Sequence, residues 1–385
     1  MTGPEAARIE MLLPAMHAAG METMVAGLCR ALVARGFDAG ITCLEEEGAL
    51  APALRADGLR VSVVRTPGFL PNLVPGALRD WLAERRPDVV HAHSGVWLKA
   101  VRAARAAGVR RTVYTAHGLL DRTPRHHFWM MRMAARGTDR IVGVSEALTR
   151  VLIDQAGSPP ARTLTIANGV DTDHFAPGPH SGAVRLPLGL APGIPLVGIV
   201  ARLAAVKNHA CLVDAFALVR ERHPEAILAL VGDGPLRGDL EAQVARLGLT
   251  DSVRFAGGAT DMPPIYRDLD IFVLSSVAEG TSISILEAMA TGCCVVATAV
   301  GGTPALLGDG AAGVLVPSAD PVALAAAIVD LLDDPSRRRR LGLAARERAE
   351  RVYSEQAMVD RYLELYGLRT MAGAASGLER ATCAE

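Results

Sequence analysis

Short apolar runs alternate along most of the chain with stretches in which apolar residues recur at helical spacing. An apolar run rich in β-branched residues is typical of a buried strand, and apolar residues three or four positions apart are typical of an amphipathic helix. The alternation predicts repeated strand–helix–strand units, which form parallel sheets covered by helices. The strands that we predict are Ile9–Leu13, Ala39–Leu44, Val61–Val64, Val89–Ala92, Arg111–Thr115, Ile141–Val144, Leu164–Ala167, one beginning at Leu196, Ala226–Leu230, Asp270–Ser276 and Cys294–Thr298.

The periodicity stops between residues 168 and 195, where glycine and proline are frequent. Such a stretch is typical of a linker, so we predict one domain over 1–168 and a second over 169–353. A last helix over 354–368 carries apolar residues at helical spacing, and we expect the small, polar tail 369–385 to be disordered.

Composition adds limits on function. The chain has 385 residues, 50% of them hydrophobic, and a net charge of −1, which suits two α/β domains and gives no general attraction to nucleic acid. Its six cysteines form no Cys-x-x-Cys pair, which argues against a structural zinc and suits a reduced compartment. Because the N-terminus lacks a signal-peptide pattern and no apolar run reaches about 18 residues, we predict a cytoplasmic protein without a membrane span.

A segment from Glu279 to Glu287, Glu-Gly-Thr-Ser-Ile-Ser-Ile-Leu-Glu, joins a predicted strand to a predicted helix. The backbone amides at a helix N-terminus, here those of Thr281, Ser282 and Ile283, suit a phosphate group. A carboxylate beside them is useful if the ligand also carries hydroxyl groups, as a sugar does. The alternative is that Glu279 only favours the helix terminus and that Glu287 faces solvent.

This segment resembles the Glu-x7-Glu signature of retaining glycosyltransferases with the GT-B fold, in particular family 4. The resemblance implies that Glu279 contacts the donor sugar, that Glu287 contacts the ribose of the nucleotide, and that Gly280 and the residues after it bind the donor. It also implies an α/β fold of two Rossmann-like domains facing across a cleft, with a C-terminal helix that returns to the first domain.

Two cations precede this segment, Arg202 and Lys207, in the loop after the strand that begins at Leu196. Two positive charges beside a helix N-terminus can neutralise a diphosphate, and an arginine can do so through two parallel hydrogen bonds. Their spacing resembles the Arg-x4-Lys phosphate pair of the same family. Without that context they are ordinary surface charges.

Three histidines, His91, His93 and His117, lie at the ends of two predicted strands, whose carboxyl ends converge on one crevice if the strands are adjacent and parallel. No carboxylate or cysteine accompanies them at ligand spacing, so we predict hydrogen bonding and no metal. His117-Gly118 resembles the active-site histidine of the family. His91 and His93 are either acceptor-side residues or core residues.

The first predicted crossover departs from the family pattern. Its loop usually carries two glycines that allow the backbone to approach the ligands, and here only Gly20 is present, followed by Met21. The resemblance still assigns Gly20 to donor binding. It assigns the segment 255–261 to a loop around the nucleotide base, whose identity the sequence does not reveal.

Two further segments have alternative interpretations. Asp171-x-Asp173 is similar to the metal-binding Asp-x-Asp of the other glycosyltransferase fold, but it lies in the linker, so we interpret it as structural. Residues 122–136 combine bases with bulky apolar side chains, which fits either peripheral contact with the inner membrane face or a helix packed on the core.

The sequence therefore predicts a metal-independent, retaining glycosyltransferase without a cofactor. It would move a sugar from a nucleotide-diphosphate sugar to a glycan, lipid-linked or small-molecule acceptor. The alternatives are a GT-B nucleotide-sugar epimerase and a binding protein without turnover.

Overall fold

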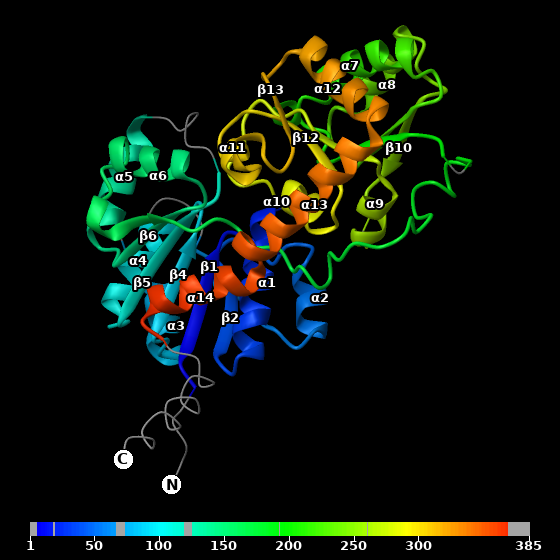
Figure 1. Ribbon diagram of the computed structural model, residues 1–385. Coiled ribbons are helices and arrows are strands. Elements are labelled where there is room, and N and C mark those ends of the chain that lie inside the picture. Colours follow the sequence, from blue (N-terminus) through cyan, green and yellow to red (C-terminus); the bar gives the residue numbers. More distant parts are fainter. Residues whose placement is uncertain are drawn as a thin grey trace, which may run out of the picture. The chain divides into compact units, whose positions relative to one another are not determined.

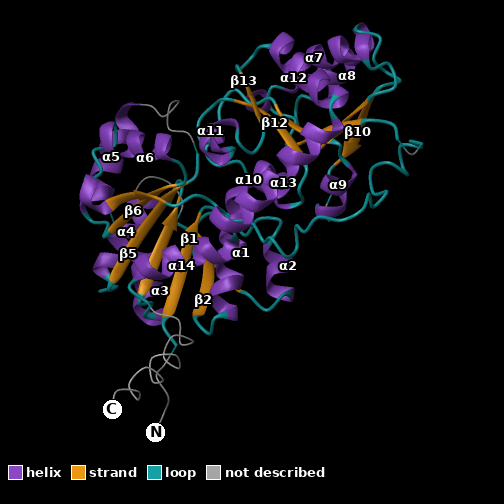
Figure 2. Cartoon of the chain, in the orientation of Figure 1, coloured by secondary structure: helices purple, strands orange, loops and turns teal. Residues whose placement is uncertain are grey.

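The computed structural model describes residues 6–17, 20–66, 74–118, 125–191, 193–259 and 261–368, with the side chains of 125 and 126 excepted (Figures 1 and 2). The chain divides into two compact units. One comprises the residues up to Asn168 and those from Glu355 onward, and the other comprises Gly169–Ser354. The predicted disordered tail 369–385 and residues 122–124 of the basic stretch lie outside the described residues.

The first unit contains a parallel sheet of seven strands in the order β3-β2-β1-β4-β5-β6-β7. Its strands are β1 (Arg8–Leu13), β2 (Asp38–Cys43), β3 (Arg60–Val63), β4 (Val89–His93), β5 (Arg111–Ala116), β6 (Arg140–Gly143) and β7 (Thr163–Thr165). Its α-helices are α1 (Gly20–Ala34), α2 (Ala51–Ala56), α3 (Gly76–Arg85), α4 (Trp97–Ala106), α5 (Arg125–Arg136), α6 (Glu146–Asp154) and α14 (Glu355–Tyr366). The central strands are almost wholly buried, which explains why their sequences are continuous apolar runs.

The second unit contains a parallel sheet of six strands in the order β10-β9-β8-β11-β12-β13. Its strands are β8 (Leu196–Val200), β9 (Ile227–Val231), β10 (Val253–Gly257), β11 (Ile271–Leu274), β12 (Cys294–Thr298) and β13 (Val314–Val316). Its α-helices are α7 (His209–Arg222), α8 (Arg237–Arg246), α9 (Pro263–Asp268), α10 (Ile283–Ala290), α11 (Thr303–Leu306), α12 (Pro321–Asp333) and α13 (Pro335–Val352). Within this unit α7 packs beside α12, and α10 beside α13 (Figure 1).

Both sheets change their direction of winding at one place. In the first unit the switch lies between β1 and β4, and in the second between β8 and β11. Ligands of open α/β sheets bind at such a switch, in the crevice outside the carboxyl ends of the strands. The strand order thus marks one candidate binding edge in each unit.

The last helix, α14, belongs to the first unit and lies against α1. Its apolar residues at helical spacing are all buried, namely Met358, Val359, Tyr362, Leu363 and Tyr366. On its exposed side, the Arg35 guanidinium binds the Asp360 carboxylate at 2.5 Å. Apolar packing and this ion pair hold α14 to its unit.

Helix α5 covers the described part of the predicted basic amphipathic segment. Phe128, Met130, Met131 and Met133 pack against the apolar core of the first unit, whereas Trp129 is 59% exposed. Core packing accounts for most of the bulky apolar residues in this helix. Among the described residues, no helix combines the length and the apolar character needed to span a membrane.

The structure corrects some predicted boundaries. The predicted strand Asp270–Ser276 is only Ile271–Leu274. Before its start the Asp270 carboxylate accepts a hydrogen bond from the Leu196 amide at 2.9 Å, and after its end the Ser275 hydroxyl donates to the Lys207 carbonyl at 2.9 Å. The prediction that 255–261 is a loop is wrong for its first residues. Phe255 pairs with Leu230 of β9, so the loop begins only after Gly257.

Candidate active site

The predicted phosphate and sugar residues of the second unit gather at the carboxyl ends of β8 and β11. Arg202 follows β8, Lys207 ends a short 3-10 helix (Ala205–Lys207), and Glu279 and Gly280 lie between β11 and α10. These are the two strands at the winding switch of the sheet. The fold therefore brings residues from distant parts of the sequence to the edge where a ligand is expected.

An ion pair joins two of these residues. The Lys207 ammonium donates to Oε1 of Glu279 at 2.6 Å, and the Ser276 hydroxyl donates to the same oxygen at 2.6 Å. Glu279 is only 7% exposed, so its carboxylate is held in one place by a charge and a hydroxyl. We did not predict this pairing from the sequence, which suggested separate ligand contacts for the two residues.

The backbone around the ion pair is fixed by contacts between the two loops. The Ser275 hydroxyl donates to the carbonyl oxygens of Lys207 at 2.9 Å and Asn208 at 3.1 Å, and the Val277 amide donates to the Val206 carbonyl at 2.9 Å. These bonds tie the end of β11 to the loop that carries Lys207. They explain why a lysine and a glutamate 72 residues apart meet here.

The backbone of Gly301 lies directly against the backbone of Glu279. Gly301 has a φ of 53°, and a Cβ at this position would lie 1.7 Å from the Glu279 carbonyl oxygen. The neighbouring Gly302 amide donates to the Gly280 carbonyl at 3.0 Å. Only glycine permits this approach, so the loop after β12 holds the Glu279 backbone in position.

Helix α10 starts where the sequence predicted. Ser282 is its N-cap and accepts a hydrogen bond from the Ile285 amide at 3.4 Å, while Thr281 precedes the cap and Ile283 is the first helical residue. The N-terminus of this eight-residue helix thus lies directly after Glu279 and Gly280. Its macrodipole places partial positive charge at this edge of the sheet.

Glu287, about one turn into α10, has an aromatic partner. The Tyr266 hydroxyl of α9 donates to its Oε2 at 2.6 Å. Burial raises the pKa of the Glu287 carboxyl from 4.5 to about 7. Nothing in the sequence singled out Tyr266 as a partner of Glu287. The contact shows that Glu287 is not a freely solvated charge.

The three histidines of the first unit lie close together near the carboxyl ends of β4 and β5: the rings of His91 and His93 pack against each other, and His93 is hydrogen-bonded to His117. Nδ1 of His93 lies 3.0 Å from Nε2 of His117, while His91 binds the Tyr366 hydroxyl at 2.7 Å and the Thr115 hydroxyl at 2.8 Å. Burial lowers the pKa of His117 to about 3 and the pKa values of His91 and His93 well below 6.5. All three rings are therefore neutral at physiological pH.

Gly20 and Asp171, two further residues singled out in the sequence, lie at the start of a helix and in a turn. Gly20 is the first residue of α1, after β1, and so lies on the binding edge of the first sheet. Oδ1 of Asp171 accepts hydrogen bonds from the amides of Asp173 at 3.0 Å and His174 at 2.9 Å, which makes it a turn-forming side chain. Within the described ranges, no three His, Cys, Asp or Glu residues are grouped as metal ligands.

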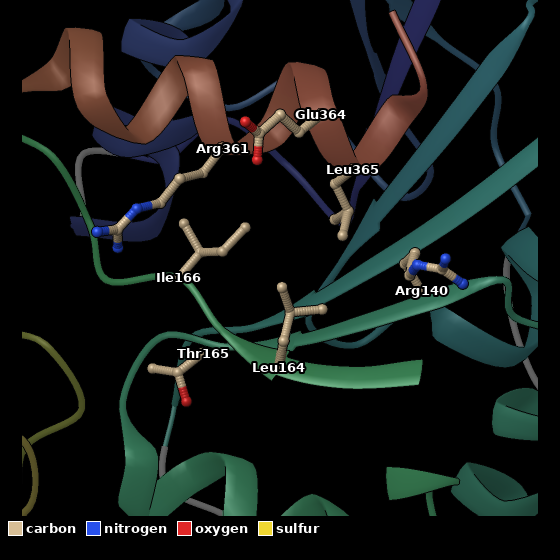
Figure 3. Close-up of a pocket in the computed structure, with 7 residues that line it drawn as sticks. All are labelled: Arg140, Leu164, Thr165, Ile166, Arg361, Glu364 and Leu365. Carbon is tan, nitrogen blue, oxygen red and sulfur yellow. The ribbon is translucent and has the colours of Figure 1, made fainter. Parts of the chain in front are cut away.

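The first unit also contains an open hollow of about 280 Å³ between β6, β7 and α14 (Figure 3). It is lined by Arg140, Leu164, Thr165, Ile166, Arg361, Glu364 and Leu365. In Figure 3 the two guanidinium groups point away from one another, at opposite ends of an apolar floor. None of the predicted site residues lines this hollow, and its charged groups do not converge on a common ligand.

Two family models match the chain. The model described as Glycosyltransferase Family 4 matches residues 18–174, and the model described as Glycosyl transferases group 1 matches residues 194–334. The first match contains the histidine cluster, and the second contains Arg202, Lys207, Glu279 and Glu287.

Named relatives extend over most of the chain. The chain is 31% identical to the D-inositol 3-phosphate glycosyltransferase of Kineococcus radiotolerans over 394 aligned residues, covering 91% of this chain and 90% of that protein. It is 34% identical over 261 residues to a GDP-mannose-dependent alpha-(1-6)-phosphatidylinositol monomannoside mannosyltransferase of Mycolicibacterium smegmatis, covering 63% of this chain and 66% of that protein. Both are transferases by name, so they give the epimerase alternative no support.

A solved structure has the same fold. The crystal structure of Anabaena HepE in complex with UDP and glucose matches with a TM-score of 0.83 and 25% identity, covering 94% of this chain and 99% of that chain. This likeness and the two parallel sheets confirm the predicted α/β fold class.

Proposed function

Because this chain belongs to glycosyltransferase family 4, we propose that the ion-paired edge of its second unit binds a nucleotide-diphosphate sugar and promotes transfer of the sugar. The acceptor class that we propose is a glycan, a lipid-linked sugar or a small polar molecule. The observation that carries the proposal is the Lys207–Glu279 pair, fixed by Ser276 at the winding switch beside a helix N-terminus.

In this proposal the diphosphate is held by Arg202, Lys207 and the N-terminal amides of α10. Arg202 is exposed and its guanidinium has no polar partner among the described residues, so it is available to a phosphate. Negative charge grows on the leaving diphosphate as the bond to the sugar breaks. Fixed cations and a helix dipole stabilise that charge without reorganising during the reaction.

The two glutamates have different proposed partners. Glu279 accepts hydrogen bonds from the sugar hydroxyls, because an ionised carboxylate has room for more donors than Lys207 and Ser276 alone. Glu287 accepts from the ribose, next to the Tyr266 hydroxyl that already binds its Oε2. Gly280 allows the donor to approach the backbone between them.

For His117 we propose a hydrogen bond near the reacting sugar, made by a neutral ring. Its pKa of about 3 excludes a charged imidazolium at physiological pH. Gly20, at the start of α1, is the proposed donor contact on the same edge of the first unit. Retention of configuration is part of the proposal and follows from family membership.

Thermal melting with UDP, GDP and ADP tests the donor site directly. We expect one nucleotide to raise the melting temperature of the wild-type chain, because a ligand that binds only the folded state stabilises it. Arg202→Ala and Lys207→Ala should lose most of this shift. A matched control is Arg222→Ala, which removes another exposed arginine of the same unit, its side chain 70% exposed, at a site away from these loops.

The same variants distinguish a transferase from a binding protein without turnover. With the stabilising nucleotide as its diphosphate sugar, the wild-type chain should release nucleotide when acceptors are added, and Glu279→Gln should release very little. Equal stabilisation of wild-type and Lys207→Ala protein would overturn the assignment of the diphosphate site. Donor binding without any release across a broad acceptor panel would favour a binding protein.

A further inference from the structure

Helix α9 lies between the predicted linker and one of the two proposed donor carboxylates. It packs beside α10, and its Tyr266 hydroxyl donates to Oε2 of Glu287 at 2.6 Å. Tyr266 is fully buried, whereas Glu287 is only partly buried. Oε1 of Glu287 has no hydrogen-bond partner within the described ranges and is not enclosed by protein. The tyrosine thus holds the inner carboxylate oxygen and leaves the outer oxygen open to a ligand.

The ring of Tyr266 has little freedom to move. It packs against Phe272 of β11 with a centroid separation of 5.7 Å, and against Phe175 of the linker with a separation of 6.1 Å. Its hydroxyl is therefore presented at one place. Because a hydrogen bond to an ionised carboxylate is stronger than one between neutral groups, this hydroxyl decides how the Glu287 carboxylate is turned.

The helix that carries Tyr266 is fastened to the linker. The Arg267 Nε donates to the Ala176 carbonyl at 2.8 Å, and the Arg267 carbonyl accepts from Nδ1 of His180 at 2.9 Å. The buried Asp268 carboxylate accepts hydrogen bonds of 2.7–3.2 Å from four linker amides, those of Ser181, Gly182, Val184 and Arg185. Since a helix of six residues is too short to be stable alone, these bonds hold α9 in place.

We propose that Tyr266 is a positioning residue that turns Oε1 of Glu287 toward the ribose of the nucleotide, and that the linker supports this contact by holding α9 and the Tyr266 ring. The inference rests on the proposed contact between Glu287 and the ribose. It makes the ribose hydroxyls the part of the donor whose recognition depends on Tyr266 and the linker, whereas the diphosphate is bound by other residues.

The ratio of affinities for a nucleotide and its deoxy forms measures this recognition. The probe is whichever of UDP, GDP and ADP stabilises the wild-type chain, compared with its 2′-deoxy and 3′-deoxy forms by calorimetric titration. At about pH 8.5, where Glu287 is ionised, one deoxy form or both should bind wild-type protein roughly ten-fold more weakly. Tyr266→Phe keeps the ring and removes the hydroxyl, and it should reduce this ratio to about three-fold or less.

Tyr353→Phe is the matched control. It also removes a buried tyrosine hydroxyl of the second unit, one that donates to the Ala305 carbonyl at 3.0 Å, and it should keep the wild-type ratio. Phe175→Ala tests the linker, because it removes the ring that packs on Tyr266 and leaves the Tyr266 hydroxyl and Glu287 in the chain. Its side chain is partly exposed, so the variant should fold, and its ratio should fall by about two-fold or more.

The outcomes separate this inference from the function on which it rests. Equal binding of the ribose and deoxyribose forms by wild-type protein would overturn the contact between Glu287 and the ribose, and the inference with it. A wild-type preference that Tyr266→Phe keeps in full would overturn the inference and leave that contact standing. A preference that Tyr266→Phe loses and Phe175→Ala keeps would overturn the part assigned to the linker.

Discussion

The Lys207 ammonium and the Glu279 carboxylate lie 2.6 Å apart in a site where the carboxylate is almost inaccessible to water. Each group neutralises the other, so a ligand that contacts both must share them with the ion pair. In the proposed donor complex the diphosphate attracts the ammonium, while sugar hydroxyls donate to the carboxylate. The pair can therefore keep both charges balanced before and after donor binding.

The first prediction follows from this pair. Glu279→Gln should reduce turnover by at least about 100-fold, because a neutral amide accepts the sugar hydroxyls more weakly, a loss of about 3 kcal/mol. It should also lower the free energy of unfolding by about 1–3 kcal/mol, because Lys207 loses its charged partner. Kinetics and urea unfolding measure the two effects. Near-native turnover in this variant would exclude a catalytic role for Glu279.

The double variant Lys207→Met with Glu279→Gln separates pairing from ligand contact. If the two residues act on each other, the unfolding penalty of the double variant should be smaller than the sum of the single penalties. Additive penalties would show that the ion pair contributes nothing to stability.

A second prediction concerns Gly301, whose backbone passes over Glu279. Gly301→Ala should abolish nucleotide binding, since a Cβ would lie 1.7 Å from the Glu279 carbonyl oxygen and must displace the loop. Gly248→Ala is the matched control. Its φ is also positive, at 68°, but nothing lies within 4 Å of an added Cβ, so only backbone strain of about 1 kcal/mol is expected. Calorimetric titration with the nucleotide measures the difference, and equal affinities would contradict the prediction.

The sequence alone was sufficient to predict the parallel sheets and the approximate position of each candidate site residue along the strands and loops. Val89–Ala92 and Cys294–Thr298 lie in strands that are buried on both faces of their sheets. Such strands can be recognised in a sequence because their residues are almost all apolar. The edge at which Arg202, Lys207 and Glu279 meet follows from the chain order of strands and loops.

The partners of those residues were not predictable in the same way. Tyr266 reaches Glu287 from a six-residue helix, and Ser276 reaches Glu279 from the end of a strand, so neither contact leaves a periodic pattern. The boundary of β10 was also missed, because the pairing of Phe255 with Leu230 is a long-range contact in a segment rich in glycine. Side-chain partners depend on the packing of distant elements, which local propensity does not encode.

A third prediction uses the raised pKa of Glu287. Ribose hydroxyls bind best to the ionised carboxylate, so nucleotide affinity should rise as pH increases through about 7 and then level off. Glu287→Gln should bind more weakly and lack this pH dependence. Isothermal titration between pH 5.5 and pH 8.5, a range of roughly 1.5 units on each side of that pKa, measures both curves. A wild-type curve with no inflection near pH 7 would contradict the prediction.

The stability of the empty protein should change in the opposite direction with pH. Between 4.5 and about 7 the folded state holds a proton on Glu287 that the unfolded state has released, so the unfolding free energy falls as pH rises through this window. The upper limit of the fall is about 3 kcal/mol. The difference in unfolding free energy between wild-type protein and Glu287→Gln, measured at several pH values, isolates this contribution from other groups.

The last prediction concerns metal. A leaving diphosphate needs its charge balanced, either by a divalent ion or by fixed cations and helix dipoles. The second unit supplies Arg202, Lys207 and the N-terminus of α10 at one edge. Asp171, the alternative metal ligand, instead accepts hydrogen bonds from the amides of Asp173 and His174. We therefore expect transfer to continue after exhaustive chelation and after Asp173→Asn.

The matching experiment adds magnesium to Lys207→Ala. This variant should lose most of its activity, and magnesium should not restore it, because the described residues contain no group of three His, Cys, Asp or Glu side chains that could hold the ion. Complete inhibition of the wild-type enzyme by a chelator, reversed by magnesium or manganese, would instead place the charge balance on a bound ion. Asp171 and Asp173 would then be the first candidate metal ligands to substitute. The Asp171 carboxylate could coordinate the ion once it gives up its hydrogen bonds to the amides of Asp173 and His174.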